Sequence, residues 1–185
     1  MITDVREIGD GVLMRLAALS DAPAVADALV RNREYMAPWE PVRPEEFYTG
    51  AGQRARLSML LRGLEAGVGA SWVLVDGDRV VGGFTLSGIS LGYFRSGQLG
   101  YWVDKEYAGR GLATAAVRAV CETARDDLLL HRVEAGTLLD NTASQRVLAK
   151  CGFESYGVAP KYLYIAGDWR DNRLFQRLLH DGPPR

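Results

Sequence analysis

The apolar positions in the first third of the chain follow one short strand-like pattern and two longer helix-like patterns. An apolar run at residues 12–16 predicts a strand. Apolar residues at helical spacing then predict a helix that opens with Ser20 as its N-cap and ends near Asn32. A second helix is predicted from about residue 50 to 66, where leucines recur at helical spacing: Leu57, Leu60, Leu61 and Leu64.

Between these helices lies a segment that is too broken by proline for regular structure and too apolar for an idle solvent loop. Residues 34–49, EYMAPWEPVRPEEFYT, contain three prolines and four aromatic residues. We interpret the segment as a lid or a wall of a substrate site, with Tyr35, Trp39 and Glu40 as candidate substrate contacts. The alternative is that its aromatic side chains belong to the core.

From residue 71 the period of the apolar positions changes from about 3.6 to two. Residues 71–76 and 79–86 flank an Asp-Gly turn and predict a hairpin, and residues 98–103 predict a further strand. The remaining pattern predicts helices at 112–126 and 141–150, and strands at 132–138, 153–156, 162–166 and 172–178.

The order of these elements, β-α-α-β-β-β-α-β-α-β-β-β, indicates an α/β (α+β) domain. Its sheet should be mixed and mostly antiparallel, with helices on both faces. We expect one domain over residues 1–180, followed by a flexible tail at residues 181–185.

The charge balance excludes several classes of partner. The 185 residues carry 22 Lys and Arg against 23 Asp and Glu, a net charge of −1, so no global positive field attracts nucleic acid or an anionic membrane. No apolar stretch approaches the roughly 18 residues of a spanning helix. Acidic residues precede any apolar run at the N-terminus, so no signal peptide is read there.

The cysteines and histidines do not form a metal-binding pattern. Cys121 and Cys151 lie too far apart for a zinc ribbon or a redox pair. His131 and His180 have no Cys or carboxylate at ligand spacing. We therefore expect a cytoplasmic protein that uses no metal, nucleic acid or membrane, and that is a monomer or a homodimer.

The sequence YWVDKEYAGRGLATAAV at residues 101–117 joins a strand to a helix through a glycine-rich turn. Gly109 and Gly111 lie at the mouth of the predicted helix, where free N–H groups and the helix dipole favour an anion such as phosphate. A plain helix start punctuated by glycine is the alternative. The chain has no Gly-Lys pair, which excludes a Walker A loop, and Thr114 stands where a dinucleotide fingerprint needs its third glycine.

Four short sequence blocks are informative as a set. They are N-R-E-Y-M-A-P-W-E-P at residues 32–41, E-Y-A-G-R-G-L-A at 106–113, H-R-V-E-A-G-T-L-L-D-N-T-A-S at 131–144 and C-G-F at 151–153. In this order and spacing they resemble the GNAT acetyltransferases, in the RimJ/RimL-type branch of ribosomal-protein N-terminal acetyltransferases. The resemblance spans most of the chain. It implies the GNAT fold, with splayed central strands, and acetyl-CoA as co-substrate.

The resemblance also implies which residues hold acetyl-CoA. Its pyrophosphate is expected on the glycine-rich turn, which comprises Gly109, Arg110, Gly111, Leu112, Ala113 and Thr114. The family's matching strand splays from the strand at 132–137, so the pantetheine arm is expected to pair with the free backbone edge of Tyr101, Trp102 and Val103. Asn141 matches the family residue near the thiol end, and Ser144 the residue near the departing sulfur.

The family's chemistry is direct attack of a neutral amine on the thioester, through a tetrahedral oxyanion, with a thiolate leaving. Ser144 is the candidate acid that protonates this thiolate, which needs only a modest acid because a thiol pKa is about 8.5. Asn141 and Glu40 complete the candidate catalytic set. The alternative is that Asn141 and Ser144 only cap the helix at 141–150. Cys151 is interpreted as a buried structural thiol.

Glu40 and Glu134 are the candidate carboxylates for deprotonating the acceptor amine, directly or through water, and both are candidate substrate contacts. An ordinary structural role is the alternative for each. The branch usually has a glutamate where this chain has Tyr156, which leaves Tyr156 as a candidate substrate contact alone.

The resemblance and the pKa of amines together indicate the acceptor. An α-amine, with a pKa of about 8, needs little help to lose its proton at pH 7, whereas a lysine, with a pKa of about 10.4, needs more. We expect the acceptor to be the α-amine of a protein N-terminus, such as that of a ribosomal protein. The alternatives are acetylation of a small amine or antibiotic, and an acyl-CoA-binding sensor without turnover.

Overall fold

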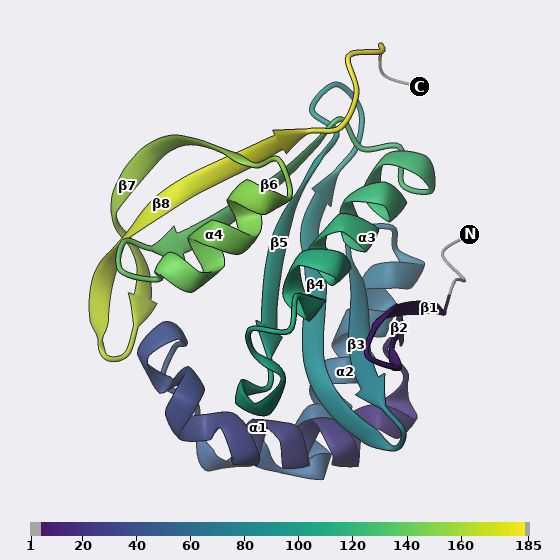
Figure 1. Ribbon diagram of the computed structural model, residues 1–185, viewed down its shortest axis with the longest axis vertical. Helices are drawn as coiled ribbons and strands as arrows, with labels where there is room; N and C mark the ends of the chain where they lie inside the picture. Colours follow the sequence, from purple (N-terminus) through teal and green to yellow (C-terminus); the bar gives the residue numbers. More distant parts are fainter. Residues whose placement is uncertain (1–4, 184–185) are drawn as a thin grey trace.

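The structure, a computed structural model, describes residues 5–183 and is built on a sheet of eight strands (Figure 1). The strands lie in the order β1-β2-β3-β4-β5-β6-β8-β7. Among the described pairings, that of β5 with β6 is parallel and the others are antiparallel. The strand bounds are Arg6–Gly9 (β1), Val12–Leu16 (β2), Ala70–Asp76 (β3), Arg79–Ser90 (β4), Ser96–Val103 (β5), Arg132–Leu138 (β6), Glu154–Ile165 (β7) and Asp168–Leu178 (β8).

Helices cover both faces of this sheet (Figure 1). On one face, α1 and α2 bury their apolar stripes against Val73 and Val75 of β3. On the other face, α3 buries Val117 and Val120 in a cluster that includes Phe84 of β4, and α4 packs beside α3. This arrangement confirms the predicted fold class. The helix bounds are Ala22–Met36 (α1), Gly50–Glu65 (α2), Leu112–Asp126 (α3) and Thr142–Lys150 (α4).

The first helix begins one residue later than predicted. Leu19–Asp21 forms a short 3₁₀ helix, so Asp21 rather than Ser20 is the N-cap of α1. The Asp21 carboxylate accepts hydrogen bonds from Arg15, at 2.6 Å, and from the Ala18 amide, at 2.8 Å. The ion pair between Arg15 and Asp21 fixes where α1 begins, and the spacing of apolar residues could not predict this pair.

The end of α1 lies four residues beyond the predicted end at Asn32. The buried Asn32 side chain donates to the Ala28 carbonyl and accepts from the Lys105 amide, each at 2.9 Å. These two bonds offset the weak helix propensity of asparagine. The prediction of an irregular segment at 34–49 was wrong in part, because α1 enters it and two short 3₁₀ helices follow: Ala37–Trp39 and Glu45–Tyr48.

The C-terminal strands differ from the prediction in number. The strands expected at 153–156 and 162–166 are one long strand, β7, which pairs with β8 on both sides of a register shift between Ala159 and Leu163. Pro160 interrupts the strand pattern in the sequence, and Lys161, which follows it, has a positive φ of +49° at the register shift. Since β7 lies at an edge of the sheet, one of its sides needs no partner and the bulge is tolerated. The other edge strand, β1, was not predicted.

The other elements lie where the sequence placed them, to within a few residues. The hairpin, α2, α3, β6 and α4 are all present. In the described part of the chain no helix is long and apolar enough to cross a membrane. Residues 184–185 of the predicted tail lie outside the described residues.

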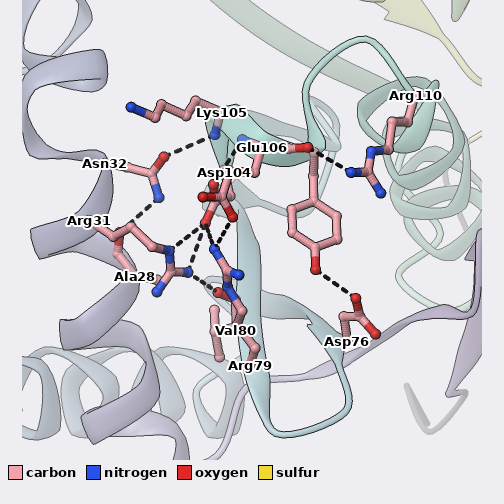
Figure 2. A network of polar contacts seen from close by, with 11 residues as sticks. Ala28, Arg31, Asn32, Asp76, Arg79, Val80, Asp104, Lys105, Glu106 and Arg110 are labelled. Carbon is pink, nitrogen blue, oxygen red and sulfur yellow. Dashed lines mark hydrogen bonds and ion pairs between the residues drawn. The ribbon is translucent and has the colours of Figure 1, made fainter.

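A buried carboxylate fixes the start of the loop between β5 and α3 (Figure 2). Asp104, which directly follows β5, is fully buried and forms ion pairs with Arg31 of α1, at 2.7 Å, and Arg79 of β4, at 3.4 Å. It also accepts a hydrogen bond from the Glu106 amide at 3.0 Å. Burial alone would raise the pKa of Asp104, but these hydrogen bonds and charges outweigh burial and lower it.

Other bonds tie the rest of this loop to its surroundings. The Tyr107 hydroxyl donates to Asp76 of β3 at 2.6 Å, and Arg110 donates to the Glu106 carbonyl at 2.9 Å (Figure 2). Together with the bond from the Lys105 amide to Asn32, these contacts anchor the loop to α1 and to the β3–β4 hairpin. The start of α3 is therefore held in place from two sides.

Replacing the buried carboxylate tests this anchor. Asp104→Asn is expected to lower the free energy of unfolding by about 2 kcal/mol. The reason is that Arg31, Arg79 and the Glu106 amide would lose the negative charge of the carboxylate that binds all three. Urea unfolding followed by circular dichroism measures the change. Asp126→Asn is the matched control, because Asp126 pairs with Arg125 on the exposed surface, and there we expect no measurable change.

The pH dependence of this difference has a defined sign. Because the pKa of Asp104 is lowered in the folded protein, its contribution is fully present above the unfolded pKa of about 3.9 and is lost as the pH falls further. The stability gap between the wild type and Asp104→Asn should therefore narrow below about pH 4. A gap that widened toward acid pH would contradict this account.

Candidate functional site

The two central strands separate halfway along their length. β5 and β6 are paired at Ser96–Arg132, Gly97–Val133 and Gln98–Glu134, and their pairing ends there. Beyond this point β5 continues to pair with β4, and β6 with β8. A cavity of about 710 Å³ opens between the separated halves. The splay that the family resemblance implied is thus present in the structure.

Most of the predicted site residues line this cavity. From β5 and the mouth of α3 these are Tyr101, Trp102, Val103, Gly109, Gly111, Leu112, Ala113 and Thr114. The start of α4 contributes Asn141 and Ser144, and the segment at the end of α1 contributes Tyr35, Trp39 and Glu40. The structure therefore brings together residues from four separate parts of the sequence.

The mouth of α3 presents free backbone amides to the cavity. Gly111 is the N-cap of α3 and has no side chain to satisfy these amides. The Ala115 amide donates to the Gly111 carbonyl at 3.0 Å, so the amides of Leu112, Ala113 and Thr114 precede the first helical hydrogen bond. With the positive end of the helix dipole, these amides form a site suited to an anion.

Two glycines are required here by backbone conformation rather than by crowding. Gly109 and Gly111 have φ angles of +79° and +83°. A Cβ atom added at either position would meet no atom within 4 Å. A side chain at these positions would therefore be resisted by the left-handed backbone and would project into open space at the mouth of α3.

The sequence left open whether Asn141 and Ser144 cap α4 or act in the reaction, and in the structure only Asn141 is a cap. Asn141 is the N-cap of α4, and its side chain accepts from the Ser144 amide at 3.1 Å. Ser144 does not cap the helix, because its hydroxyl lies 2.8 Å from the Tyr101 hydroxyl. Burial raises the pKa of Tyr101 to about 12, so this phenol stays protonated at neutral pH.

The position of the Tyr101 side chain was not predicted, because the family resemblance implied a backbone role alone for this residue. Alternation along β5 directs Tyr101 toward α4 and Trp102 toward α1 and α2, as their core clusters record. The Tyr101 ring stacks on Phe84, with ring centroids 5.3 Å apart. This stack and the contact with Ser144 fix the position of the hydroxyl.

Glu40 is the carboxylate that faces the cavity. Among the described residues that line the cavity it is the one acidic side chain. Burial raises the pKa of Glu40, although the nearby positive charges of Arg43 and Arg56 oppose the shift. Its backbone carbonyl accepts from the Ala166 amide at 3.1 Å, which ties this segment to the turn between β7 and β8. A half-buried carboxylate with a raised pKa suits a general base.

Three predicted site residues do not line the cavity. Glu134 forms an ion pair with Arg132 at 3.3 Å, and Tyr156 lies beside Glu134. Burial, then this carboxylate, raises the pKa of Tyr156. The guanidinium of Arg110 lies over the ring of Tyr107, at 4.7 Å, so it turns back onto its own loop.

Two polar residues of the cavity wall were not found from the sequence. Thr137 of β6 and Asn172 of β8 are buried, and the Thr137 hydroxyl and the Asn172 carbonyl oxygen have no hydrogen-bond partner among the described residues. Both line the cavity. An asparagine in the middle of a strand was the available signal for Asn172. Arg146 and Lys150 of α4 also reach the cavity and give it positive charge.

The cysteine near the site is structural. The buried Cys151 thiol lies 3.4 Å from the Thr114 carbonyl, and burial raises its pKa. A thiol in this state is a poor nucleophile. Within residues 5–183 no group of three or more His, Cys, Asp and Glu is arranged to hold a metal ion.

Comparisons with known proteins agree with this geometry. The family model described as an acetyltransferase (GNAT) domain matches residues 12–154. The [ribosomal protein uS5]-alanine N-acetyltransferase of Escherichia coli is 33% identical over 185 residues, which cover 99% of this chain and 95% of that protein.

Two solved structures are similar over nearly the whole chain. The ribosomal-protein-S5-alanine acetyltransferase from Vibrio fischeri has a TM-score of 0.93 and 34% identity, covering 98% of this chain and all of that one. RimJ of Mycobacterium smegmatis, solved in complex with CoA-disulfide, has a TM-score of 0.86 and 29% identity, covering 90% of this chain and 81% of that one.

Proposed function

The chain belongs to the GNAT acetyltransferase family, and from that premise we propose that it transfers the acetyl group of acetyl-CoA to the α-amine of a protein N-terminus. The observation that carries the proposal is the cavity between β5 and β6, which is lined by the mouth of α3 with its free amides and, among the described residues, by one carboxylate, Glu40. The similarity to enzymes named for alanine of ribosomal protein uS5 supports a ribosomal protein as the acceptor.

The cavity has the volume of a ligand site, and its lining has the chemistry that coenzyme A requires. Its volume of about 710 Å³ lies within the range of roughly 300–1,000 Å³ that is typical of ligand sites. The amides at the mouth of α3 would hold the pyrophosphate, and Arg146 and Lys150 would add positive charge. The unpaired edge of β5 would hydrogen-bond the pantetheine arm in the manner of an added strand. Acetyl-CoA supplies the activated acetyl thioester.

Ser144 and Tyr101 would handle the proton on the leaving-group side. The Ser144 hydroxyl would donate its proton to the departing sulfur, and the Tyr101 hydroxyl, 2.8 Å away, would replace it. Tyr101 suits this role because its raised pKa keeps it protonated. Asn141 would act as a positioning residue, since its cap bond to the Ser144 amide orients the first turn of α4.

Glu40 would accept a proton from the acceptor amine. Deprotonating an α-amine of pKa about 8 at pH 7 costs roughly 1.4 kcal/mol, whereas a lysine of pKa about 10.4 costs roughly 4.6 kcal/mol. One carboxylate therefore suits an α-amine better than a lysine. Tyr35 and Trp39, which line the cavity together with Glu40, are 44% and 36% exposed, and this exposure supports access for an extended acceptor chain.

Binding of acetyl-CoA should depend on the left-handed backbone at the mouth of α3. Acetyl-CoA at a hundredfold excess over its dissociation constant should stabilise the protein by about 2.7 kcal/mol in thermal unfolding. Gly111→Ala should weaken binding about tenfold, because the strained backbone moves the amides. Gly67→Ala is the matched control, since Gly67 also has a positive φ, +69°, and open space but lies away from the cavity.

The control should lose stability as Gly111→Ala does, with its affinity for acetyl-CoA unchanged. Equal losses of affinity in the two variants would mean that general destabilisation is responsible. Wild-type protein that showed no shift with acetyl-CoA would overturn the proposed function.

Ser144→Ala should lower kcat about 10- to 100-fold and leave KM for acetyl-CoA unchanged, because it removes the acid from the leaving-group side. Thiol release measures both. Tyr101→Phe should lower kcat in the same direction, and should have no further effect in the Ser144→Ala background, since Tyr101 acts through Ser144. Ser155→Ala, on the exposed part of β7, is the control. A rise in KM at constant kcat would assign Ser144 to binding instead.

Glu40→Gln should lower the rate most at low pH. The variant should approach the wild type as the pH rises past the acceptor pKa of about 8, because a neutral amine needs no base. The assay uses a peptide that begins with alanine, and an N-blocked peptide with one lysine as control. Preferential acetylation of the blocked lysine peptide, or of small polyamines, would overturn the α-amine proposal.

A further inference from the structure

A second, smaller cavity lies on the opposite face of the sheet, beneath α1 and α2. Its volume is about 220 Å³, below the range of roughly 300–1,000 Å³ that accommodates whole ligands, so its size fits one part of a substrate. Strands β3, β4 and β5 form its floor. It shares four lining residues with the large cavity: Glu40, Gly100, Tyr101 and Trp102. The two cavities therefore meet at Glu40 and the middle of β5.

This meeting point places the second cavity on the acceptor side. The anion-binding amides and the Ser144 hydroxyl lie on the α3 and α4 side of the sheet, where coenzyme A is proposed to bind. An amine that reaches Glu40 from the second cavity would approach from the opposite side. Gly100, which lines both cavities, leaves open space where they meet, because a Cβ atom there would meet no atom within 4 Å.

The second cavity contains an arginine that forms no ion pair or hydrogen bond with another described residue. Arg56 of α2 is half-buried and lines the cavity, and no hydrogen bond or ion pair joins its guanidinium to another described residue. Burial, then the like charge of Arg43, lowers the pKa of Arg56. A partly desolvated guanidinium is a strong donor to a carboxylate, which it can bind through two parallel hydrogen bonds.

The charges around the cavity favour a monoanion. Among the described residues that line the cavity, the charged ones are Glu40 and Arg56, whose charges balance. Arg43 does not line the cavity but acts on both, and it leaves one positive charge in excess around them. A carboxylate matches this excess, whereas a phosphate dianion exceeds it and is repelled by Glu40. Ser71 and Thr85, whose hydroxyls lie 3.1 Å apart on the floor, add uncharged polar groups.

We propose that Arg56 makes the second cavity a carboxylate subsite for the acceptor. The acceptor amine would lie at Glu40 while a carboxylate one or two residues away binds Arg56. The inference rests on the proposed function, because it places the acceptor amine at Glu40. Two sources can supply this carboxylate: an acidic side chain near a peptide N-terminus, or the α-carboxylate of a free amino acid or dipeptide.

The test compares acceptors that differ in one charge. Peptides beginning Ala-Asp, Ala-Asn and Ala-Lys are assayed for kcat/KM, with free alanine and alanine amide as a second arm. The wild type should prefer Ala-Asp over Ala-Asn about tenfold, mainly through KM. Arg56→Gln should abolish this preference. Because the charge of Arg56 also lowers the pKa of Glu40, the readout is the ratio of the Ala-Asp rate to the Ala-Asn rate, in which a change in the base cancels. Arg56→Glu should shift the preference toward Ala-Lys.

Arg54→Gln is the matched control, because Arg54 lies on the same helix but is exposed and does not line the cavity. It should keep the wild-type preference. The thermal stability and acetyl-CoA affinity of Arg56→Gln should equal those of the wild type, which separates an effect on the acceptor from a folding defect.

Each outcome decides the proposal. A preference that depends on Arg56 in the peptide arm assigns the acidic side chain as the source, and one seen only with free alanine assigns the α-carboxylate. Equal rates for Ala-Asp and Ala-Asn together with equal rates for alanine and its amide, or a preference that survives Arg56→Gln, would overturn the subsite and leave the proposed function intact. Absence of turnover with every acceptor would count against the proposed function instead, and calorimetric titration of the same acceptors would still test the subsite.

Discussion

The separation of β5 from β6 is the constraint on which the rest of the site depends. Backbone N–H and C=O groups need partners, and a strand edge inside a sheet normally finds them in its neighbour. Here β5 stays with β4 as far as Val103, and β6 stays with β8, so the facing edges beyond Gln98 are left to a ligand. The first turn of α4 contacts β5 through Ser144 and Tyr101, and this contact spans the gap. The cavity is therefore a product of strand pairing, and side chains refine it.

The anion site at the mouth of α3 depends on how firmly its loop is held. Two glycines with positive φ would leave a free loop with many conformations. Asp104 removes much of that freedom, since its ion pairs join the end of β5 to α1 and to β4. Tyr107 adds a third attachment through Asp76. The amides are thus oriented before any ligand arrives, which is the condition for strong electrostatic binding.

The sequence predicted the elements whose signals are local. The amphipathic face of α3, the Asp-Gly hairpin and the glycines before Leu112 each report their structure within a few residues. The length of α1 could not be predicted from local signals, because the Asn32 side chain accepts a hydrogen bond from the Lys105 amide, 73 positions away. Likewise the contact of Tyr101 with Ser144 joins positions 43 apart, and the turn of Arg110 onto Tyr107 depends on how the loop packs. The family resemblance identified the residues along the cavity, but burial and partners had to come from the fold.

Alternation along β5 divides the reaction between the two faces of the sheet. Tyr101 directs its hydroxyl to Ser144, on the face where the departing sulfur is proposed to lie, whereas Trp102 packs toward α1 and α2 on the acceptor face. Glu40 borders both cavities, and its backbone carbonyl joins the segment after α1 to the turn between β7 and β8. Arg56, which is proposed to select the acceptor, could therefore change without disturbing the residues that are proposed to hold coenzyme A. Because β5 and β6 separate beyond Gln98, acceptor specificity and cofactor binding would lie on opposite faces of a single strand, β5.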